Sequence, residues 1–297
     1  MVTLLVATAG GLHEVAERGG RVHLEERDVT AVHGLGWALL DGREVVHCEH
    51  GTWAPYGDLP GDVRATCLEV AAHEVFLGTG GGGLLRRDDQ GFATVEAFER
   101  APGREGWYTP WGGPPDTRSL AVTSDGALLA NVHVGGILRS DDGGASWTPT
   151  IDLHVDVHQV AGVPESDVVV ATTGTGFATS RDGGRTWAVD DEGLHGSYLR
   201  AVAVAGDAVV VSASRGPGGA DPALYRRPLA GGAFERIGAG LPDLGGNVDT
   251  GWLVADGDVV AVVLAAGSVH RSEDGGRTFA CVADGLPAPR WLAGSAA

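Results

Sequence analysis

The stretch SRDGGRTW, residues 180–187, combines a hydroxyl, a carboxylate, two glycines and an aromatic side chain in a short segment. Two near copies occur in the chain, SDDGGASW at 140–147 and SEDGGRTF at 272–279. The aligned aspartates, which lie 40 and 92 residues apart, are Asp142, Asp182 and Asp274. The longer interval corresponds to two units of about 46 residues, so the chain is built from repeats.

Each repeat contains short alternating segments that are separated by glycine- and aspartate-rich turns. In the repeat at 155–194, HQVAG alternates, DVVVATT is a β-branched run, and FATS precedes the motif. Period-2 alternation bounded by Gly, Asp and Pro is the signature of strands and hairpins. Four short strands in a unit of roughly 40–45 residues is the pattern of a β-propeller blade.

We therefore predict an all-β fold, a single seven-bladed β-propeller with four-stranded antiparallel blades. Residues 2–28 supply only the later strands of one blade, and residues 290–297 resemble its missing first strand. Strands from both termini would close the ring and remove exposed sheet edges, which favours seven blades over the alternative of six. The predicted blades of this single domain, 1–297, are 2–28 plus 290–297, 30–61, 62–99, 117–153, 155–194, 198–241 and 249–287, with an insertion at 99–116.

The motif falls at the turn between the third and fourth strands of its blade. There Asp-Gly-Gly supplies the positive φ angles of a tight hairpin, and the carboxylate can accept hydrogen bonds from its own turn. The aromatic residue is expected to pack against the sheet. The residues that define this structural motif are Ser140, Asp142, Gly144, Trp147, Ser180, Asp182, Gly184, Trp187, Ser272, Asp274, Gly276 and Phe279.

The pattern S-x-D-G-G-x-[ST]-[WF] resembles the Asp-box, or BNR repeat, of sialidases, some glycoside hydrolases, sortilin-type receptors and photosystem assembly factors. The whole chain resembles bacterial sialidase-like and glycosyl-hydrolase-like proteins with WD40/YVTN/BNR-type repeats. The resemblance implies that the box lies at the outer rim and has a structural role. A sialidase also needs an R-I-P segment, which the sequence lacks, so sialidase activity is not expected.

Charge and cysteine content narrow the classes of partner. The net charge is −18, and all 21 basic residues are arginine, which excludes a catalytic lysine. Nucleic acids and anionic membranes need clustered positive charge, so neither is expected as a partner. Three cysteines without paired spacing indicate reduced thiols and a cytoplasmic location. The segment 1–15 lacks a positive n-region and is expected to be a strand rather than a secretion signal.

Ligands of propellers usually bind at the mouth of the central channel, near the first residues of the innermost strands. Alignment of the repeats places five basic side chains there, namely Arg64, Arg118, His158, Arg200 and Arg290. Asp249 and Trp252 lie near the start of a further blade. Arginine forks bind carboxylates and phosphates, but they would equally brace neighbouring blades. The carboxylates available for such bracing are Asp62, Asp116 and Asp156.

Histidines provide a second set of candidates. Those assigned to proton transfer are His133, His154, His158 and His195, and Asn131 is on the same predicted strand face as His133. A divalent metal held by these histidines is the alternative, although their spacing lacks an HxH or HExxH pattern. No other cofactor is expected, because the sequence has no nucleotide or redox fingerprint.

The insertion at 99–116 is the longest loop, and long ordered loops are often functional. Trp107, Tyr108 and Trp111, held by neighbouring prolines, are suited to stacking on a sugar or another ring. The alternative is a plug that packs on the propeller surface.

Two functions follow from these candidates. The first is a small-molecule-binding propeller, a hydrolase or lyase if it is an enzyme, acting on an anionic or polyhydroxylated ligand at the channel mouth. The alternative is a non-catalytic scaffold that binds a protein or peptide on the same face. A binding funnel requires arginines that point into one void, whereas a scaffold has its arginines in ion pairs between blades.

Overall fold

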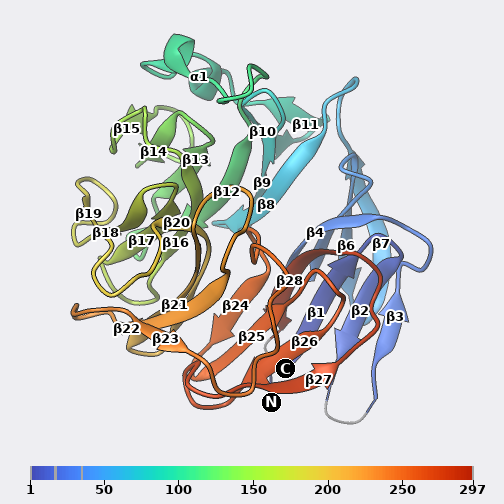
Figure 1. The fold of residues 1–297 in the computed structure, drawn as a ribbon. Coiled ribbons are helices and arrows are strands. Elements are labelled where there is room, and N and C mark those ends of the chain that lie inside the picture. The colour runs from blue at the N-terminus through green and yellow to red at the C-terminus, as the bar shows by residue number, and fades with distance from the viewer. Residues whose placement is uncertain (1, 17–18, 35, 296–297) are drawn as a thin grey trace. The chain divides into compact units, whose positions relative to one another are not determined.

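The computed structural model describes residues 2–16, 19–34 and 36–295. These residues form 28 β-strands in seven four-stranded sheets, and the fold is a seven-bladed β-propeller (Figure 1). The helices are α1 (Glu96–Glu99) and the 3-10 helix η1 (Arg104–Gly106). None of the helices in the described ranges has the length and apolarity needed to cross a bilayer. The prediction of seven antiparallel four-stranded blades is confirmed.

One blade combines both ends of the chain, as expected. Strand β28 (Pro289–Ser295) pairs with β1 (Thr3–Thr8) in an antiparallel register that places Leu5 opposite Ala293. Strands β2 (Gly11–Val15) and β3 (Arg21–His23) complete the sheet. Residues 17–18 and 296–297, which belong to the segments predicted for this blade, lie outside the described residues.

The chain divides into two compact units, and the single-domain assignment of residues 1–297 stays a prediction. Unit 1 contains the described residues of 1–41, 46–54 and 191–297, and unit 2 contains residues 42–45 and 55–190. Besides the sheet of β28 and β1–β3, unit 1 contains β20–β23 (Tyr198–Ala205, Ala208–Ser214, Ala223–Pro228, Glu235–Ile237) and β24–β27 (Leu253–Asp256, Val259–Val263, Val269–Ser272, Ala280–Ala283).

Unit 2 contains three complete sheets, and the strands of a further sheet follow β3 in the chain. The three sheets are β8–β11 (Ala65–Ala71, Glu74–Thr79, Gly83–Asp88, Gly91–Thr94), β12–β15 (Thr117–Val122, Leu128–Val132, Gly136–Ser140, Thr148–Pro149) and β16–β19 (Val157–Gly162, Val169–Thr173, Gly176–Ser180, Ala188–Asp190). The further sheet is β4–β7 (Val29–His33, Trp37–Leu40, Glu44–Glu49, Thr52–Asp58).

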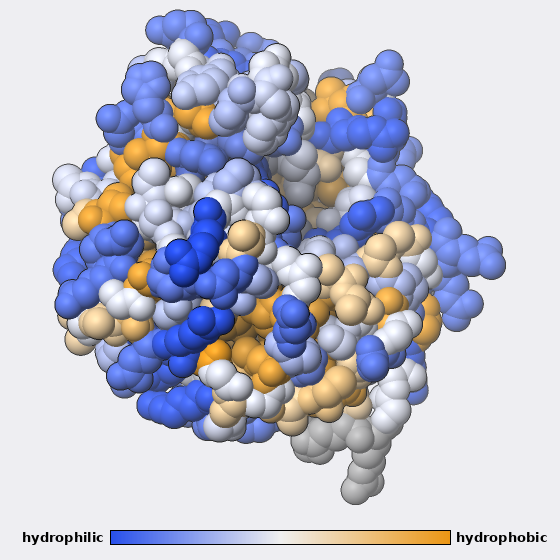
Figure 2. Space-filling model, in the orientation of Figure 1, coloured by the Kyte–Doolittle hydropathy of each residue, from blue (hydrophilic) through white to orange (hydrophobic). Residues whose placement is uncertain are grey.

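Apolar side chains between successive sheets form the core of each unit. In unit 2, Leu129, Ile137, Val157 and Val169 belong to one buried cluster between β12–β15 and β16–β19. Burying a large aliphatic side chain stabilises a fold by about 1.5–3 kcal/mol, so these clusters hold the sheets together. On the face of unit 1 shown in Figure 2, hydrophobic residues gather over β24 and β25.

The first strand of most sheets carries a β-bulge. In β12, Thr117 pairs with Val132 and Ser119 pairs with Asn131, so Arg118 is the extra residue. A bulge bends its strand and re-aims the side chain of the extra residue, and bulges are frequent next to functional sites. The residues within these register shifts are Thr30, Thr66, Arg118, His158, Arg200 with Ala201, and Arg290.

All three copies of the SxDGG motif lie between the third and fourth strands of their sheets, as predicted. In the copy at 180–187, Asp182 accepts hydrogen bonds from the backbone N–H of Thr186 at 2.9 Å and from the hydroxyl of Ser180 at 2.7 Å. Gly183 and Gly184 have φ of +72° and +85°, which side chains other than glycine rarely adopt. The other two copies repeat these hydrogen bonds with Asp142 and Asp274. The motif is therefore a self-bonded turn.

The motif also connects neighbouring sheets within each unit. An arginine within the third strand of one sheet donates to the carbonyl oxygen of the first motif glycine in the next sheet. The pairs are Arg86 with Gly143, Arg139 with Gly183, and Arg226 with Gly275. Each motif thus fixes its own turn and also accepts a hydrogen bond from the preceding sheet.

Candidate ligand-binding site

The candidate site in unit 2 is centred on the carboxylate of Asp156. This residue directly precedes β16, and its Oδ2 lies 3.1 Å from Nε2 of His158, the bulge residue of β16. Its Oδ1 lies 3.3 Å from Nε2 of His133, which follows β13. Both histidines are buried, whereas the Asp156 side chain is partly exposed. One carboxylate therefore joins two imidazoles that are far apart in the sequence.

Two carboxylates beside Arg118 have opposite pKa shifts. Burial raises the pKa of Asp116, although the charge of Arg118 and a backbone hydrogen bond from Gly81 oppose that rise. Burial also acts to raise the pKa of Asp156, but the nearby His158, His133 and Arg118 outweigh it, so its pKa is lowered. Asp156 is therefore held ionised, whereas Asp116 takes up a proton more readily than an ordinary aspartate.

The backbone explains why His133 reaches Asp156. Its N–H donates to the carbonyl of Asp116 at 3.0 Å, and its carbonyl accepts from the N–H of Val157 at 3.1 Å. In the neighbouring sheets the residue that makes the equivalent N–H hydrogen bond is glycine, Gly80 or Gly174. A histidine thus replaces glycine at the one turn that lies between Asp116 and Asp156. The sequence-based placement of His133 within a strand is corrected, because β13 ends at Val132.

The insertion at 99–116 supplies one exposed aromatic wall. The indole of Trp111 stands edge-on to the ring of His133, with ring centroids 4.8 Å apart, and Trp111 is 72% exposed. Tyr108 is also exposed, and its N–H donates to the carbonyl of Val134 at 3.0 Å. This hydrogen bond anchors the insertion beside His133.

Trp107 has a different environment from the other two aromatic residues. It is only 8% exposed and packs on Phe98, with ring centroids 5.6 Å apart. The guanidinium of Arg104 lies 4.7 Å from the centroid of its ring. Trp107 therefore matches the plug that was the alternative for the insertion, and Trp111 and Tyr108 keep the exposed surfaces that a ligand would need.

Several other candidates of unit 2 lie apart from this cluster or have internal partners. Asn131 is fully buried, its amide donates to the carbonyl of Val157 at 2.8 Å, and it accepts from the hydroxyl of Ser119. His154 is exposed in a turn, where its N–H donates to Asp152. Arg64 precedes β8 and is exposed, and the bulge position of its strand is occupied by Thr66. The alignment of Arg64 with Arg118 was therefore two positions out of register.

The candidates of unit 1 form ion pairs between neighbouring sheets. Arg200 donates to Asp249 at 2.8 Å, and Arg290 donates to Asp28 at 2.9 Å. In both pairs the arginine is in the bulge of one first strand and the aspartate precedes the first strand of the next sheet. These contacts match the bracing role that was the alternative for the first-strand arginines.

Trp252 and His195 of unit 1 also have internal partners. The indole N–H of Trp252 donates to the carbonyl of Arg290 at 3.2 Å. Nδ1 of His195 lies 2.7 Å from the hydroxyl of Tyr225, and its Nε2 lies 2.7 Å from the carbonyl oxygen of Asp221. The four candidate histidines therefore do not all belong to one cluster, since His133 and His158 share Asp156, His154 is exposed, and His195 contacts residues of unit 1.

No group of three or more His, Cys, Asp or Glu side chains in the described part of the chain is arranged to hold a metal ion. The divalent metal stays a prediction, and none of the chemistry below depends on it.

Asp116 and Asp156 are the residues whose role sequence reasoning missed. Both appeared only as partners for arginines. The signal that was available is their position, because each stands two residues before a bulge residue, Arg118 or His158. Together with His133 and Trp111, they give a carboxylate that is held ionised, a carboxyl group with a raised pKa and an exposed aromatic surface.

No protein-family model and no curated protein matches the chain. Solved structures with a similar fold include a GH74 xyloglucanase from Xanthomonas campestris, at 19% identity and a TM-score of 0.57 over 95% of this chain and 47% of that chain. An ancestral GH74 enzyme is 16% identical, with a TM-score of 0.61 over 94% of this chain and 40% of that one. A chain of the mitotic checkpoint complex is 11% identical, with a TM-score of 0.59 and coverages of 87% and 80%.

These similarities concern the fold. The chain spans less than half the length of the two GH74 structures. Propellers of similar fold thus occur both in GH74 enzymes and in a protein complex, and the similarity by itself assigns no function.

Proposed function

We propose that unit 2 binds a polyhydroxylated ligand, a sugar chain, at the cluster of Asp156, His133, Arg118 and Trp111. The observation that carries the proposal is the position of Trp111. Its indole is 72% exposed and stands edge-on to His133, whose imidazole forms an ion pair with the partly exposed carboxylate of Asp156. Tyrosine and tryptophan are enriched at binding interfaces, and the face of an exposed indole suits the apolar face of a sugar.

The charges of the cluster favour hydroxyl groups over an anion. Asp156 is ionised at neutral pH, and although burial acts to raise its pKa, the nearby His158, His133 and Arg118 lower it. An ionised carboxylate accepts hydrogen bonds from hydroxyls and repels a second anion. Of the two ligand classes expected from the sequence, the polyhydroxylated one therefore fits better, and the two similar GH74 structures point to a β-glucan as the first ligand to test.

The same residues support hydrolysis of the bound sugar. Glycosidases generally use two carboxyl groups, one that donates a proton to the leaving group and one that acts as a base or nucleophile. Groups whose pKa values are moved in opposite directions are suited to these two roles. In our proposal Asp116, with its raised pKa, protonates the leaving-group oxygen as the glycosidic bond breaks, and Asp156 takes a proton from the water whose oxygen bonds to the anomeric carbon.

The binding proposal is tested by calorimetric titration of the intact chain with a xyloglucan heptasaccharide. We expect Trp111→Ala to weaken binding by about 10-fold, the effect of losing one aromatic contact of about 1–1.5 kcal/mol. Asp156→Asn should weaken it by at least about 10-fold, because the lost hydrogen bonds are charge-assisted. The matched control is Asp249→Asn, which changes a carboxylate in the segment before the first strand β24 of unit 1 and should leave the affinity unchanged.

The hydrolysis proposal has a separate readout, the release of reducing ends from xyloglucan. Asp116→Asn and Asp156→Asn should each abolish turnover, and Asp249→Asn should not. Binding without turnover in the wild type would limit the site to recognition.

A second candidate function, a non-catalytic scaffold, is favoured by unit 1. Both of its bulge arginines are in ion pairs between sheets, Arg200 with Asp249 and Arg290 with Asp28. A scaffold would bind protein through the aromatic face of unit 2. The test of the scaffold uses peptides that the wild type selects from a random display library. The scaffold is supported instead if the heptasaccharide shows no saturable binding and Trp111→Ala abolishes binding of those peptides.

A further inference from the structure

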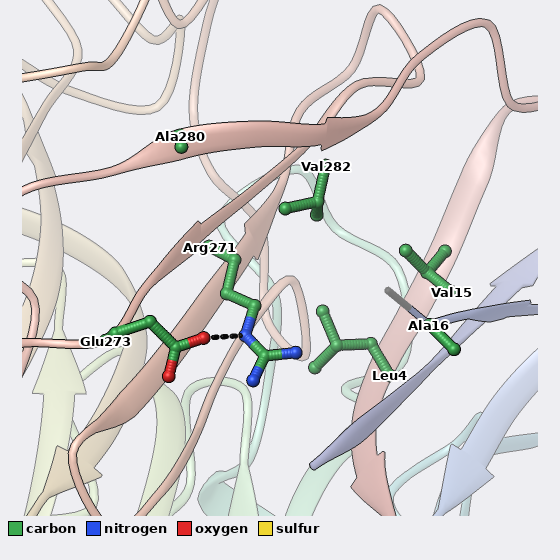
Figure 3. A pocket seen from close by; sticks show the side chains of 7 residues that line it. All are labelled: Leu4, Val15, Ala16, Arg271, Glu273, Ala280 and Val282. Carbon is green, nitrogen blue, oxygen red and sulfur yellow. Dashed lines mark ion pairs between the residues drawn. The ribbon is translucent and has the colours of Figure 1, made fainter. Parts of the chain in front are cut away.

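A separate cavity lies in unit 1 between the sheet of β24–β27 and the sheet of β28 and β1–β3 (Figure 3). Its volume is about 310 Å³. The residues that line it are Leu4, Val15, Ala16, Arg271, Glu273, Ala280 and Val282. Most of this lining is aliphatic, and one arginine and one glutamate supply its charge.

This cavity occurs where the neighbouring sheet lacks the SxDGG motif. We call the interface between two neighbouring sheets a seam. At three other seams, the second motif glycine packs on a residue in the second strand of the preceding sheet. The pairs are Gly144 with Phe76, Gly184 with Leu129, and Gly276 with Val210. At the seam with the cavity, the register places Ala261 at the position of Phe76, Leu129 and Val210. The sequence after β2 reads AERGG (16–20) and does not match the SxDGG motif, and the facing residue Ala261 is small.

The arginine at this seam has the same place in its sheet as the arginines that bind a motif glycine. Arg271 pairs in register with Ala261, as Arg139 does with Leu129. Its Nε lies 2.5 Å from Oε1 of Glu273, and its Nη1 donates to the carbonyl of Val2 at 3.0 Å. Its side chain is only 10% exposed.

Figure 3 shows the guanidinium among the labelled side chains, with Glu273 at one end and Leu4 beyond the two terminal nitrogens. A guanidinium has five N–H donors, and the contacts with Glu273 and Val2 within the described residues do not use all of them. Donors therefore remain for an oxygen atom inside a mainly aliphatic cavity.

We propose that this cavity binds a small aliphatic monocarboxylate, with its carboxylate on Arg271 and its chain against Leu4, Val15 and Val282. At the other seams the equivalent arginine donates to a carbonyl oxygen of the motif loop. Here Nη1 of Arg271 donates to the carbonyl of Val2, and the ligand supplies an acceptor for further N–H groups of the guanidinium. A guanidinium binds a carboxylate in preference to a neutral carbonyl because the hydrogen bonds are charge-assisted. At about 30 Å³ for each water, the cavity has the volume of roughly ten waters, which suits a ligand of about ten non-hydrogen atoms.

The test is a calorimetric or ligand-observed NMR titration of the intact chain with octanoate, with 1-octanol as the uncharged comparison. We expect saturable 1:1 binding of octanoate and at least about 10-fold weaker binding of 1-octanol, since a hydrogen bond to a charged group has that effect. Arg271→Gln should weaken octanoate by about 10-fold and leave 1-octanol nearly unchanged. Equal affinities of octanoate for wild type and Arg271→Gln would overturn the proposal.

A second variant keeps the test independent of Arg271 and of folding. Val282 of β27 lines the cavity and is 43% exposed, so Val282→Glu should fold and should reduce octanoate binding by placing a negative charge at the cavity. The matched control is Val189→Glu in β19, another fourth strand, where the valine is 45% exposed and far from the lining residues in sequence. Loss of binding in both variants, or in neither, would contradict the assignment.

Discussion

The bulge residues of unit 1 and unit 2 occupy the same register position and have different surroundings. In unit 1, Arg200 and Arg290 form ion pairs with Asp249 and Asp28, which join one sheet to the next. In unit 2, the bulge residues His158 and Arg118, together with His133, lower the pKa of Asp156. The same backbone device, an extra residue in a first strand, thus produces bracing pairs in one unit and a cluster of titratable groups in the other.

The difference lies in two features of the sequence around β12. His133 stands where the sheets on either side have Gly80 and Gly174, and the insertion at 99–116 places Trp111 against its ring. An aspartate before a first strand is common to both units, so it does not by itself make a site. A repeat position therefore gains a new role when its neighbours change. Here His133 replaces a glycine, and the insertion at 99–116 adds an aromatic loop.

The largest effect is expected when the site is converted to the pattern of its neighbours. His133→Gly restores the residue found at Gly80 and Gly174, so the turn should still form, but Asp156 and Trp111 lose their shared contact. Affinity for the heptasaccharide should fall by about 100-fold, because the change removes the ionic contact of His133 with Asp156 and the aromatic contact that positions Trp111. Calorimetric titration measures the change, and an unchanged affinity would separate His133 from binding.

The next effect tests the arginine contact that both units share. Arg139 is buried and donates to Asp125 at 2.7 Å and to the motif carbonyl of Gly183. Arg139→Leu leaves these acceptors without their donor, so the free energy of unfolding should fall by about 2–3 kcal/mol. Urea unfolding measures this value. Arg226→Leu, the equivalent change in unit 1, should show a decrease of similar size, and a decrease in only one unit would contradict the shared role.

A smaller effect separates bracing from binding. Arg200→Ala removes a partly buried ion pair, and we expect the free energy of unfolding to fall by about 1 kcal/mol, because Asp249 and the arginine are both partly exposed. Affinity for the heptasaccharide should not change. A loss of affinity in Arg200→Ala without a loss of stability would show that Arg200 contributes to binding, which contradicts its bracing role in unit 1.

The smallest effect concerns pH. The pKa of Asp156 is lowered, so its stabilising effect is complete above the unfolded value of about 3.9 and is lost as the pH falls through the folded pKa. The pKa of Asp116 is raised by burial, so its ionised form opposes folding at neutral pH, and that penalty decreases as the pH falls through the raised folded pKa. Asp156→Asn should therefore destabilise the chain at pH 7, and Asp116→Asn should not.

Urea unfolding at pH 7 and pH 3 measures both variants. At pH 7 the free energies of unfolding of the two variants should differ from wild type in opposite directions. Both differences should be smaller at pH 3. The same direction for both variants would show that their environments are alike.

Much of the fold follows from the sequence, because three motifs at regular intervals fix the turns and the apolar alternation between them fixes the strands. The observed sheets are seven and four-stranded as predicted, and one of them combines strands from both ends of the chain. The register of the first strand could not be predicted in the same way. A bulge shifts the alignment without any residue signature, and Arg64 was therefore matched with Arg118 although Thr66 holds the bulge position.

The candidate site was only partly predictable for a related reason. Arg118 and His158 were identified from their repeat position, but Asp156 was expected only as a bracing partner for an arginine. Its role depends on the turn of the preceding sheet, which brings His133 to its carboxylate. In the insertion, Trp107 and Trp111 look alike in sequence, and packing on Phe98 decides that Trp107 is the buried one.

The most direct test of the sugar site is the indole N–H spectrum of the intact chain during titration with the heptasaccharide. The chain has eight tryptophans, and the Trp111 resonance is assigned by its loss in Trp111→Phe. We expect the Trp111 signal to move along a saturable curve, while those of the buried Trp107 and of Trp252 in unit 1 stay in place. A Trp111 signal that does not move at saturating sugar, or equal movement of all the indoles, would contradict a ligand site at Asp156 and His133.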